Sequence, residues 1–233
     1  MHPITRLVRK VVRSRGFDMV HYAPWKNLFK AFEIDLILDV GAHAGETYDS
    51  FRWAGFEGPI NSYEPNPETF HRLQTKNGAL WQKFQLALSS QTGQLKFFVT
   101  NNDNTCGLQA PLGDQYKVVR EIVVPAWRLD ELWQKEGISA KHVFLKIDAE
   151  GHDLEVIKGA AGVLDRIDLI MAEVSPLSRY VGEPPLHEFL NYMNELGFRV
   201  CRIDKSALNI EAGIDTAPDI VFAKTKLLEK LSA

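Results

Sequence analysis

Short apolar runs alternate along the chain with segments whose apolar residues recur at helical spacing. Five of the runs predict strands, at residues 36–40, 60–63, 84–88, 142–148 and 168–174. Helical spacing predicts helices in the stretch that ends near residue 54 and at residues 67–77, 129–135, 154–164 and 186–196. Continuous apolar runs are typical of parallel strands buried on both faces. The alternation therefore predicts an α/β fold, with a mostly parallel sheet and helices on both faces.

The middle and the end of the chain depart from this alternation. Residues 93–100 and 120–127 form two β segments that flank a polar loop at residues 101–117. The loop could face a substrate, although an ordinary hairpin tip would look the same. Residues 198–204 and 219–224 are close enough in sequence to form an antiparallel strand pair. Because no linker-like segment interrupts residues 34–233, we predict that they form one domain.

Residues 1–33 form a basic leader region. The apolar side chains of residues 4–15 share one helical face, with arginines on the other. Residues 1–30 contain seven basic residues and one acidic residue, so the rest of the chain has an excess of acidic groups. We interpret this amphipathic segment as a helix packed on the domain. Peripheral contact with a membrane surface or with a partner protein is the alternative.

Composition and charge exclude several classes of protein. The formal net charge of −3 argues against a general nucleic-acid binder. Cys106 and Cys201 are far apart in sequence and indicate neither a disulfide framework nor a zinc site. No apolar run approaches the roughly 18 residues that span a bilayer, and no secretory signal pattern is visible. We therefore expect a cytoplasmic protein, and the sequence leaves its oligomeric state open.

A glycine-bracketed turn follows the first predicted strand, in the motif LDVGAHAGE at residues 38–46. In open α/β sheets, ligands bind at this place. A phosphate-binding P-loop would need a Lys-Ser or Lys-Thr pair after the second glycine, and a dinucleotide motif would need glycines in place of His43 and Glu46. Glu46 at a helix start would also oppose a pyrophosphate. The turn therefore favours a ligand without phosphates and weakens the alternative of a nicotinamide dehydrogenase.

S-adenosylmethionine meets these requirements, because it carries an ammonium, a carboxylate and a ribose but no phosphate. We predict that Asp39 and Glu46 interact with the ammonium, directly or through water, and that backbone N–H groups near Gly41 bind the carboxylate. Glu64 ends the second strand, where a carboxylate can accept hydrogen bonds from both ribose hydroxyls. The backbone of residues 88–89 could contact the adenine, although a plain strand end would look the same. The predicted cofactor-binding residues are Asp39, Gly41, Ala42, His43, Gly45, Glu46, Glu64, Pro65, Asn66, Leu88, Ser89 and Asp148.

Several segments together resemble the FkbM family of methyltransferases. They are LDVGAHAGE (38–46), YEPNP (63–67), LALSS (86–90), RLDEL (128–132), LKIDAEGHDLEVIKGA (145–160) and LIMAEVSP (169–176). The resemblance covers about residues 34–224 and implies a Rossmann-like, seven-stranded sheet whose last two strands are the antiparallel pair. It also implies methyl transfer from S-adenosylmethionine to a hydroxyl of a small acceptor, often a sugar, a glycan precursor or a natural product. The alternative is a non-catalytic S-adenosylmethionine-binding protein that docks a partner through its basic leader.

The segment LKIDAEGHDLE holds most of the candidate catalytic groups. Strand alternation places Lys146 and Asp148 on one side, with Asp148 at the cofactor's edge of the sheet. A base near the acceptor hydroxyl would assist its attack. We rank Asp148 first, His152 second for its intrinsic pKa near neutrality, and Glu173 third. His152 could instead cap the next helix, and Lys146 is either catalytic or the partner of Glu64 or Glu173 in a buried ion pair.

The same carboxylates raise the question of a metal. Asp148, Glu150 and Glu173 could offer oxygen ligands to Mg²⁺, which would lower the pKa of the acceptor hydroxyl. The segment MAEVSP supplies one glutamate rather than an aspartate pair, so a metal is the less favoured interpretation and we assign no metal ligand. The next segment, SPLSRYVGEPP, could close over the acceptor and bring Arg179 or Tyr180 into contact with it.

Overall fold

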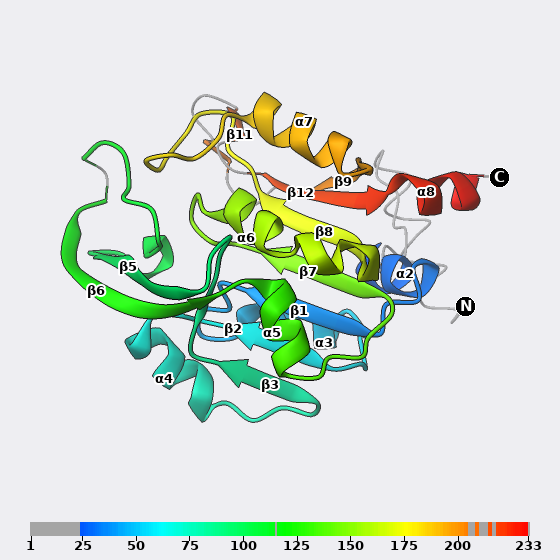
Figure 1. Cartoon of the computed structure of the whole chain (residues 1–233), viewed down its shortest axis with the longest axis horizontal. Helices are drawn as coiled ribbons and strands as arrows, with labels where there is room; N and C mark the ends of the chain where they lie inside the picture. Colours follow the sequence, from blue (N-terminus) through cyan, green and yellow to red (C-terminus); the bar gives the residue numbers. More distant parts are fainter. Residues whose placement is uncertain (1–23, 115, 205–207, 210–213, 216–217, 233) are drawn as a thin grey trace, which may run out of the picture.

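The computed structural model describes residues 24–114, 116–204, 208–209, 214–215 and 218–232 (Figure 1). Its centre is a seven-stranded sheet with the strand order β3 (Trp81–Phe84), β2 (Ile60–Tyr63), β1 (Leu36–Val40), β7 (Val143–Ile147), β8 (Ile167–Glu173), β12 (Asp219–Lys224) and β9 (Phe198–Asp204). The first five strands are parallel to one another, and β12 is antiparallel to both of its neighbours. The prediction of a mostly parallel, seven-stranded sheet with an antiparallel C-terminal pair is confirmed.

Helices cover both faces of this sheet, as predicted. On one face lie α2 (Pro24–Ala31), α3 (Glu46–Trp53) and α8 (Thr225–Ser232); on the other lie α5 (Leu129–Lys135), α6 (Asp153–Gly159) and α7 (Leu186–Glu195). The other described helices are α4 (Pro67–Thr75) and the 3₁₀ helices η1 (Asp103–Thr105) and η2 (Ala161–Arg166). Successive strand residues enter opposite cores, for example Ile37 and Leu38, because side chains alternate along a strand.

A smaller sheet stands beside the edge at which the parallel strands end (Figure 1). It has the order β4 (Ala87–Leu88), β6 (Val118–Trp127) and β5 (Gly93–Thr100). β5 and β6 pair antiparallel and flank the polar loop, as the sequence predicts. A further antiparallel pair joins β10 (Leu208–Asn209) to β11 (Ile214–Asp215). The smaller sheet therefore carries the polar loop to the edge where a ligand would bind.

Two predicted boundaries are wrong. The third strand of the main sheet is β3 rather than residues 84–88, and Ala87 and Leu88 pair with β6 in the smaller sheet. β3 is an edge strand with half-buried side chains and an exposed Gln82, so it lacks the continuous apolar run of a central strand. The helix predicted over residues 154–164 divides at Gly159 and Ala160 into α6 and η2. Glycine is a poor helix former, which favours a break at this point.

The described part of the leader region is α2. The rings of Trp25 and Phe29 stack on each other, and both contact Phe144 in the middle of the sheet. The helix predicted over residues 4–15 lies outside the described residues, and the domain division at residue 33 stays a prediction. Among the described helices, none is both long and apolar enough to cross a membrane.

Candidate active site

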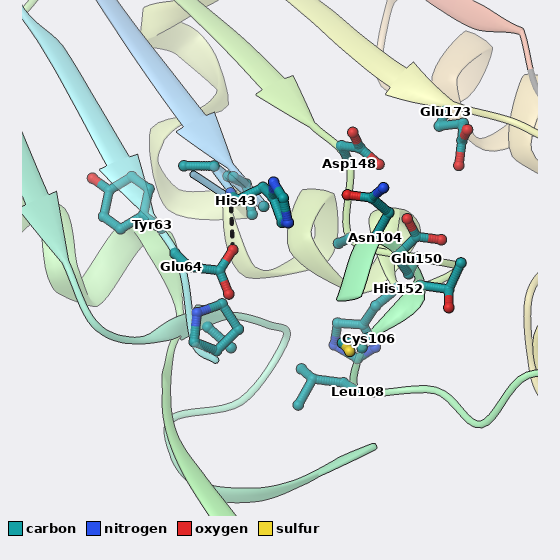
Figure 2. Close-up of a pocket in the computed structure, with 18 of the residues that line it drawn as sticks. His43, Tyr63, Glu64, Asn104, Cys106, Leu108, Asp148, Glu150, His152 and Glu173 are labelled. Atoms are coloured by element: carbon teal, nitrogen blue, oxygen red, sulfur yellow. Dashed lines mark hydrogen bonds between the residues drawn. The ribbon is translucent and has the colours of Figure 1, made fainter. Parts of the chain in front are cut away.

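A cavity of about 780 Å³ lies at the carboxyl ends of the parallel strands. Its floor consists of residues that follow β1, β2, β7 and β8, and the insertion between β5 and β6 faces them (Figure 2). The volume falls within the range of about 300–1,000 Å³ that is usual for small-molecule sites. This edge of an open α/β sheet is also where ligands are expected. The cavity is therefore the candidate active site.

Most of the predicted site residues line this cavity. They are Gly41, Ala42, His43, Glu46, Glu64, Pro65, Leu88, Lys146, Asp148, His152 and Glu173. Four predicted residues are absent from the lining: Asp39, Gly45, Asn66 and Ser89. The insertion contributes residues 102–108, and further lining residues that the sequence did not single out include Tyr63, Leu86 and Phe97. Tyr63 lies in β2, Phe97 in β5, and Leu86 directly precedes β4. All three are buried apolar or aromatic residues, so no sequence signal separates them from core residues.

The two glycines of the first turn are required by contacts within the chain. Gly41 has a φ of +70°, and a Cβ atom there would lie 1.8 Å from the backbone oxygen of Asp148. Gly45 has a φ of +93°, and its Cβ atom would lie 2.7 Å from the indole of Trp81. The turn therefore fits closely between two other strands. His43 between them also has a left-handed backbone, with a φ of 46°, a strained conformation that is common at functional sites.

Glu64 directly follows β2 and is 6% exposed. Its Oε2 accepts the backbone N–H of His43 at 2.9 Å, a bond visible in Figure 2, and its Oε1 accepts the backbone N–H of Asn66 at 2.8 Å. Burial raises the pKa of Glu64 to about 7, although both hydrogen bonds favour the charged form. Each carboxylate oxygen has a second lone pair, so the group can accept two further hydrogen bonds. That is the requirement for holding the two hydroxyls of a ribose.

Asp39 and Lys146 form a buried ion pair at the cavity floor, in which Lys146 lines the cavity and Asp39 lies behind it. Asp39 is 0% exposed, and its Oδ1 lies 3.3 Å from Nζ of Lys146, while Ser62 donates to its Oδ2 at 3.1 Å. Nζ of Lys146 also lies 3.5 Å from Oδ2 of Asp148. Burial lowers the pKa of Lys146, but the charges of Asp39 and Asp148 outweigh it and hold that pKa above its ordinary value. The partners of Lys146 are thus aspartates rather than the predicted Glu64 or Glu173. The register of β1 and β7 places Asp39 beside Lys146, and Asp148 lies two residues after Lys146 in the chain.

This placement also bears on the predicted role of Asp39. A fully buried carboxylate behind the floor does not reach the cavity, so a direct contact with a cofactor ammonium does not fit the structure. Glu46 lines the cavity, so its predicted contact with the cofactor ammonium stays compatible with the structure. Asp39 instead fixes the ammonium of Lys146, and Lys146 in turn contacts the carboxylate of Asp148, which does line the cavity.

His152 immediately precedes α6 and is buried. Its Nδ1 lies 3.1 Å from the side-chain nitrogen of Gln109, and its Nε2 lies 3.0 Å from Oγ of Ser89. The Gln109 amide nitrogen can only donate, so Nε2 carries the ring proton and donates to Ser89. Burial lowers the pKa of His152 to about 4. The predicted advantage of a pKa near neutrality is therefore wrong, because the surrounding protein removes the water that would stabilise the charged ring.

Three carboxylates gather at the ends of β7 and β8. Oxygens of Asp148, Glu150 and Glu173 lie within 4.8 Å of one another. Each has a different partner: Asp148 has Lys146, Glu173 pairs with the guanidinium of Arg179, and Glu150 accepts the hydroxyl of Tyr180. Burial, followed by the charge of Asp148, raises the pKa of Glu173 to about 7. Arg179 and Tyr180 come from the loop after β8, so this loop reaches the carboxylates. Its predicted contact with the acceptor stays a prediction.

The partners of the three carboxylates bear on whether this group would bind a metal ion. Three carboxylate oxygens at this spacing have the chemistry that Mg²⁺ prefers. Lys146 and Arg179 already supply two positive charges to the group, however, which is the role that a divalent cation would have. Lys146 also shares its charge with Asp39, so four carboxylates face two cations and the group keeps an excess of negative charge. We assign no metal ligand, and the metal-free interpretation stays a prediction.

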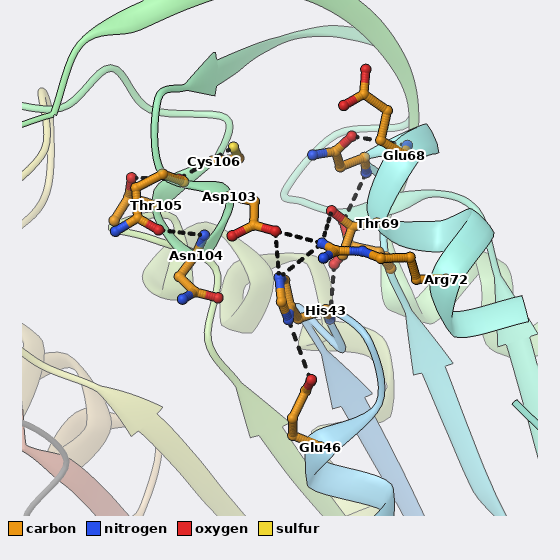
Figure 3. Close-up of polar contacts among 12 residues, drawn as sticks. His43, Glu46, Glu68, Thr69, Arg72, Asp103, Asn104, Thr105 and Cys106 are labelled. Atoms are coloured by element: carbon orange, nitrogen blue, oxygen red, sulfur yellow. Dashed lines mark hydrogen bonds and ion pairs between the residues drawn. The ribbon is translucent and has the colours of Figure 1, made fainter.

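The insertion is joined to the first turn and to α4 by a polar network (Figure 3). Nη2 of Arg72 lies 2.5 Å from Oδ2 of Asp103, and Nε2 of His43 lies 3.5 Å from the same oxygen. Nδ1 of His43 lies 3.3 Å from Oε2 of Glu46. The pair of Arg72 and Asp103 is about half exposed, at 50% and 47%, so its contribution to stability is small. The pair nevertheless ties the insertion to α4 beside the cavity, which His43 and Asp103 line.

The fold and the site together define a class of protein. A doubly wound sheet with an antiparallel C-terminal strand carries a glycine turn after β1 and a buried carboxylate after β2, with no phosphate-binding motif. The cavity of about 780 Å³ begins between these two features and continues to a polar end at β7 and β8. The protein is an S-adenosylmethionine-dependent methyltransferase.

The chain belongs to the FkbM methyltransferase family, since the Methyltransferase FkbM domain matches residues 39–200. It is 25% identical over 172 residues to the 2-O-methyltransferase NoeI of Sinorhizobium fredii, an alignment that covers 68% of this chain and 70% of that protein. It is 28% identical over 153 residues to the hexuronic acid methyltransferase AglP of Haloferax volcanii. That alignment covers 63% of this chain and 59% of that protein.

Among solved structures, a Burkholderia thailandensis 1,6-didemethyltoxoflavin-N1-methyltransferase aligns over 87% of this chain and 77% of that chain. The TM-score is 0.47 and the sequence identity 12%. A likeness this low has no bearing on the acceptor.

Proposed function

We propose that this protein transfers the methyl group of S-adenosylmethionine to a hydroxyl of a small acceptor, a sugar or glycan precursor. The observation that carries the proposal is the continuity of the cavity, which joins the buried carboxylate of Glu64 to the polar strand ends at Asp148 and Glu173. The names of the two relatives, a 2-O-methyltransferase and a hexuronic acid methyltransferase, support a hydroxylated acceptor of this kind.

The cofactor would occupy the part of the cavity between the first turn and Glu64. Glu64 would accept the ribose hydroxyls, and the apolar lining residues Leu86, Leu88 and Phe97 offer the adenine a surface without competing water. Glu46 and the backbone of the turn would bind the amino-acid end. When bound, the cofactor supplies a sulfonium methyl group that an oxygen nucleophile can displace. The structure fits this ligand because the donors and acceptors face one cavity.

The acceptor would lie at the ends of β7 and β8. Asp148, Glu150, Glu173 and Arg179 line that part of the cavity, and their oxygens and nitrogens suit a molecule with several hydroxyl groups. Holding the acceptor oxygen in line with the methyl group accounts for a large part of the rate enhancement in such a displacement. Asp148 and Glu173 keep their positions as candidate bases, whereas the low pKa of His152 makes it a weak one.

Calorimetric titration with S-adenosylmethionine and S-adenosylhomocysteine tests the cofactor site. We expect binding to the wild-type chain, weakened by Glu64→Gln and unchanged in Glu68→Gln, which alters an exposed glutamate on α4. Methyl transfer is then measured by mass spectrometry on a panel of methyl hexosides and the corresponding hexuronic acids. Methylation of a hydroxyl supports the proposal, and methylation confined to carboxylates would overturn it.

The alternative of a non-catalytic binding protein makes the opposite prediction. It requires cofactor binding without methylation of any acceptor, together with a partner that is lost when residues 1–30 are deleted. The cytoplasmic location, the lack of a nucleic-acid partner and the oligomeric state are not addressed by the site, and the first two stay predictions from the sequence.

A further inference from the structure

The three carboxylates at the acceptor end differ in the charge of their partners. Asp148 lies beside the ammonium of Lys146, and Glu173 is paired with the guanidinium of Arg179. Glu150 accepts a hydrogen bond from the phenol of Tyr180, a neutral group. Protonation of a carboxylate that faces a cation forfeits a favourable charge interaction. The charge of Arg179 also acts on Glu150, but the ion pair of Arg179 is with Glu173. Protonation of Glu150 therefore forfeits less, so Glu150 is the carboxylate best suited to take up a proton.

The position of Glu150 is fixed from two sides. Its backbone is left-handed, with a φ of 52°, which costs energy for a residue other than glycine. From the insertion, Gly107 approaches so closely that a Cβ atom there would lie 3.1 Å from Cβ of Glu150. From the loop after β8, the buried Tyr180 packs on Gly151, where a Cβ atom would lie 2.6 Å from Cβ of Tyr180. The strained turn is therefore held between two loops.

The two loops are themselves joined by backbone hydrogen bonds. The N–H of Leu112 donates to the carbonyl of Arg179 at 2.7 Å, and the N–H of Val181 donates to the carbonyl of Ala110 at 2.8 Å. Glu183 adds a bond from the backbone N–H of Tyr180 to its carboxylate, at 3.1 Å. The phenol that donates to Glu150 is thus placed by a rigid frame, as a precise catalytic geometry requires.

We propose that Glu150 is the group that accepts the proton of the acceptor hydroxyl, and that Tyr180 is the residue that positions it. This inference rests on the proposed function. As the bond between the acceptor oxygen and the methyl carbon forms, the acceptor O–H bond breaks and its proton passes to the Glu150 oxygen that Tyr180 does not occupy. The electron pair of the broken S–CH₃ bond stays on sulfur, and the proton later leaves Glu150 for solvent.

The surroundings of Glu150 tune it for this role. Burial raises its pKa first, the charges of Asp148 and Glu173 raise it further, and the Tyr180 hydrogen bond and Arg179 lower it, with a resulting pKa of about 8. A base whose pKa lies near the working pH is largely ionised and still has a strong driving force for taking up the proton. Since Glu150 must be ionised to act, kcat/KM should rise with pH through about 8 and then level off.

The first test needs no acceptor. In the full chain labelled with δ-¹³C glutamate and saturated with S-adenosylhomocysteine, the Glu150 resonance is identified by its loss in Glu150→Gln. We expect it to titrate near pH 8 and to move higher in Tyr180→Phe, which removes a donor to the charged form. Titration in the ordinary range near 4.5 would overturn the proposal.

The second test uses whichever methyl hexoside the wild type methylates. Glu150→Gln should lower kcat by about 10²–10⁴-fold and remove the rise with pH, with unchanged binding of S-adenosylhomocysteine. Tyr180→Phe should shift that rise upward, and Glu155→Gln, on α6 outside the cavity, is the matched control. A full rate in Glu150→Gln, or activity that EDTA abolishes and Mg²⁺ restores, would overturn the assignment. Wild-type inactivity on every acceptor would instead be a failure of the proposed function.

Discussion

The two ends of the cavity are built in different ways. At the cofactor end, the carboxylate of Glu64 is held by two backbone N–H groups, and Gly41 is fixed by the backbone of the Asp148 strand end. At the acceptor end, carboxylates are held by side chains, two of them from the loop after β8. Backbone contacts tolerate many sequences, provided that the fold and its glycines persist. Side-chain contacts change with single substitutions, so the acceptor end is where specificity can vary.

The largest effect should come from a backbone contact at the cofactor end. Gly41→Ala places a methyl group on the backbone oxygen of Asp148, and we expect a loss of more than about 4 kcal/mol in unfolding free energy or no folded protein. Gly113→Ala is the matched control, because Gly113 also has a positive φ but nothing within 4 Å of a Cβ atom. It should cost about 1–2 kcal/mol. If urea unfolding shows equal losses of unfolding free energy for Gly41→Ala and Gly113→Ala, then the contact with Asp148 is not the reason for glycine at position 41.

The buried ion pair of Asp39 and Lys146 should give the next largest effect. Lys146→Met leaves Asp39 buried without a cation, and we expect a loss of about 3–5 kcal/mol in unfolding free energy. Lys158→Met removes a lysine from a partly exposed pair with Glu155 and should cost about 1 kcal/mol or less. The double variant Asp39→Asn/Lys146→Met should recover part of the loss. Additive effects in this double-mutant cycle would mean that the two residues are not coupled.

Glu64 should affect binding more than stability. Glu64→Gln keeps the shape but loses a charged acceptor, so we expect a fall of about 1.5–3 kcal/mol in the binding free energy of S-adenosylmethionine. Since ribose recognition requires the ionised form, wild-type affinity should weaken as the pH falls through about 7. Calorimetry at several pH values should show this dependence in the wild type and not in Glu64→Gln.

The same pKa predicts an opposite trend for the ligand-free protein. Between pH 4.5 and about 7 the folded Glu64 keeps a proton that the unfolded chain has released. Its contribution to stability is therefore present below pH 4.5 and is lost as the pH rises through about 7. Urea unfolding of the wild type and Glu64→Gln across this interval measures the difference, and parallel profiles would contradict the assignment.

The smallest effect should come from the polar network that joins the insertion to α4. Arg72→Ala removes an exposed partner of Asp103, so we expect a change in unfolding free energy of about 1 kcal/mol or less. We expect S-adenosylhomocysteine to dissociate faster, because the insertion loses a tie to α4. Arg120→Ala, which breaks a comparably exposed pair with Glu68, is the control and should leave the rate unchanged. Stopped-flow measurement of both variants decides whether the network retains the ligand.

The central strands were predictable because each is a continuous apolar run between turn residues. β3 escaped prediction because, as an edge strand, it has half-buried side chains and an exposed Gln82. The smaller sheet could be outlined from β5 and β6, but its third member, β4, is two residues long and joins them only through long-range pairing. The hydrophobic pattern along the chain does not reveal which distant strands pair with each other.

The site was predictable in the same uneven way. Position at a strand end was enough to place Glu64 and Asp148 at the cavity. It could not show that Asp39, one residue before the end of β1, lies behind the floor, or that register pairs it with Lys146. His152 shows the limit for electrostatics, because its low pKa depends on burial by segments distant in sequence. The partner of Glu150, Tyr180, lies 30 residues away and became evident only in three dimensions.

The backbone bonds between Leu112 and Arg179 and between Val181 and Ala110 bear on how this enzyme can be re-engineered. The insertion and the loop after β8 behave as one unit, although about 60 residues separate them in sequence. Grafting either loop alone from a relative would set its backbone donors against a mismatched neighbour. A library that exchanges residues 101–117 and 175–185 together would keep the backbone hydrogen bonds between the two loops. On this basis, a change of acceptor preference within the family would require both segments to change together.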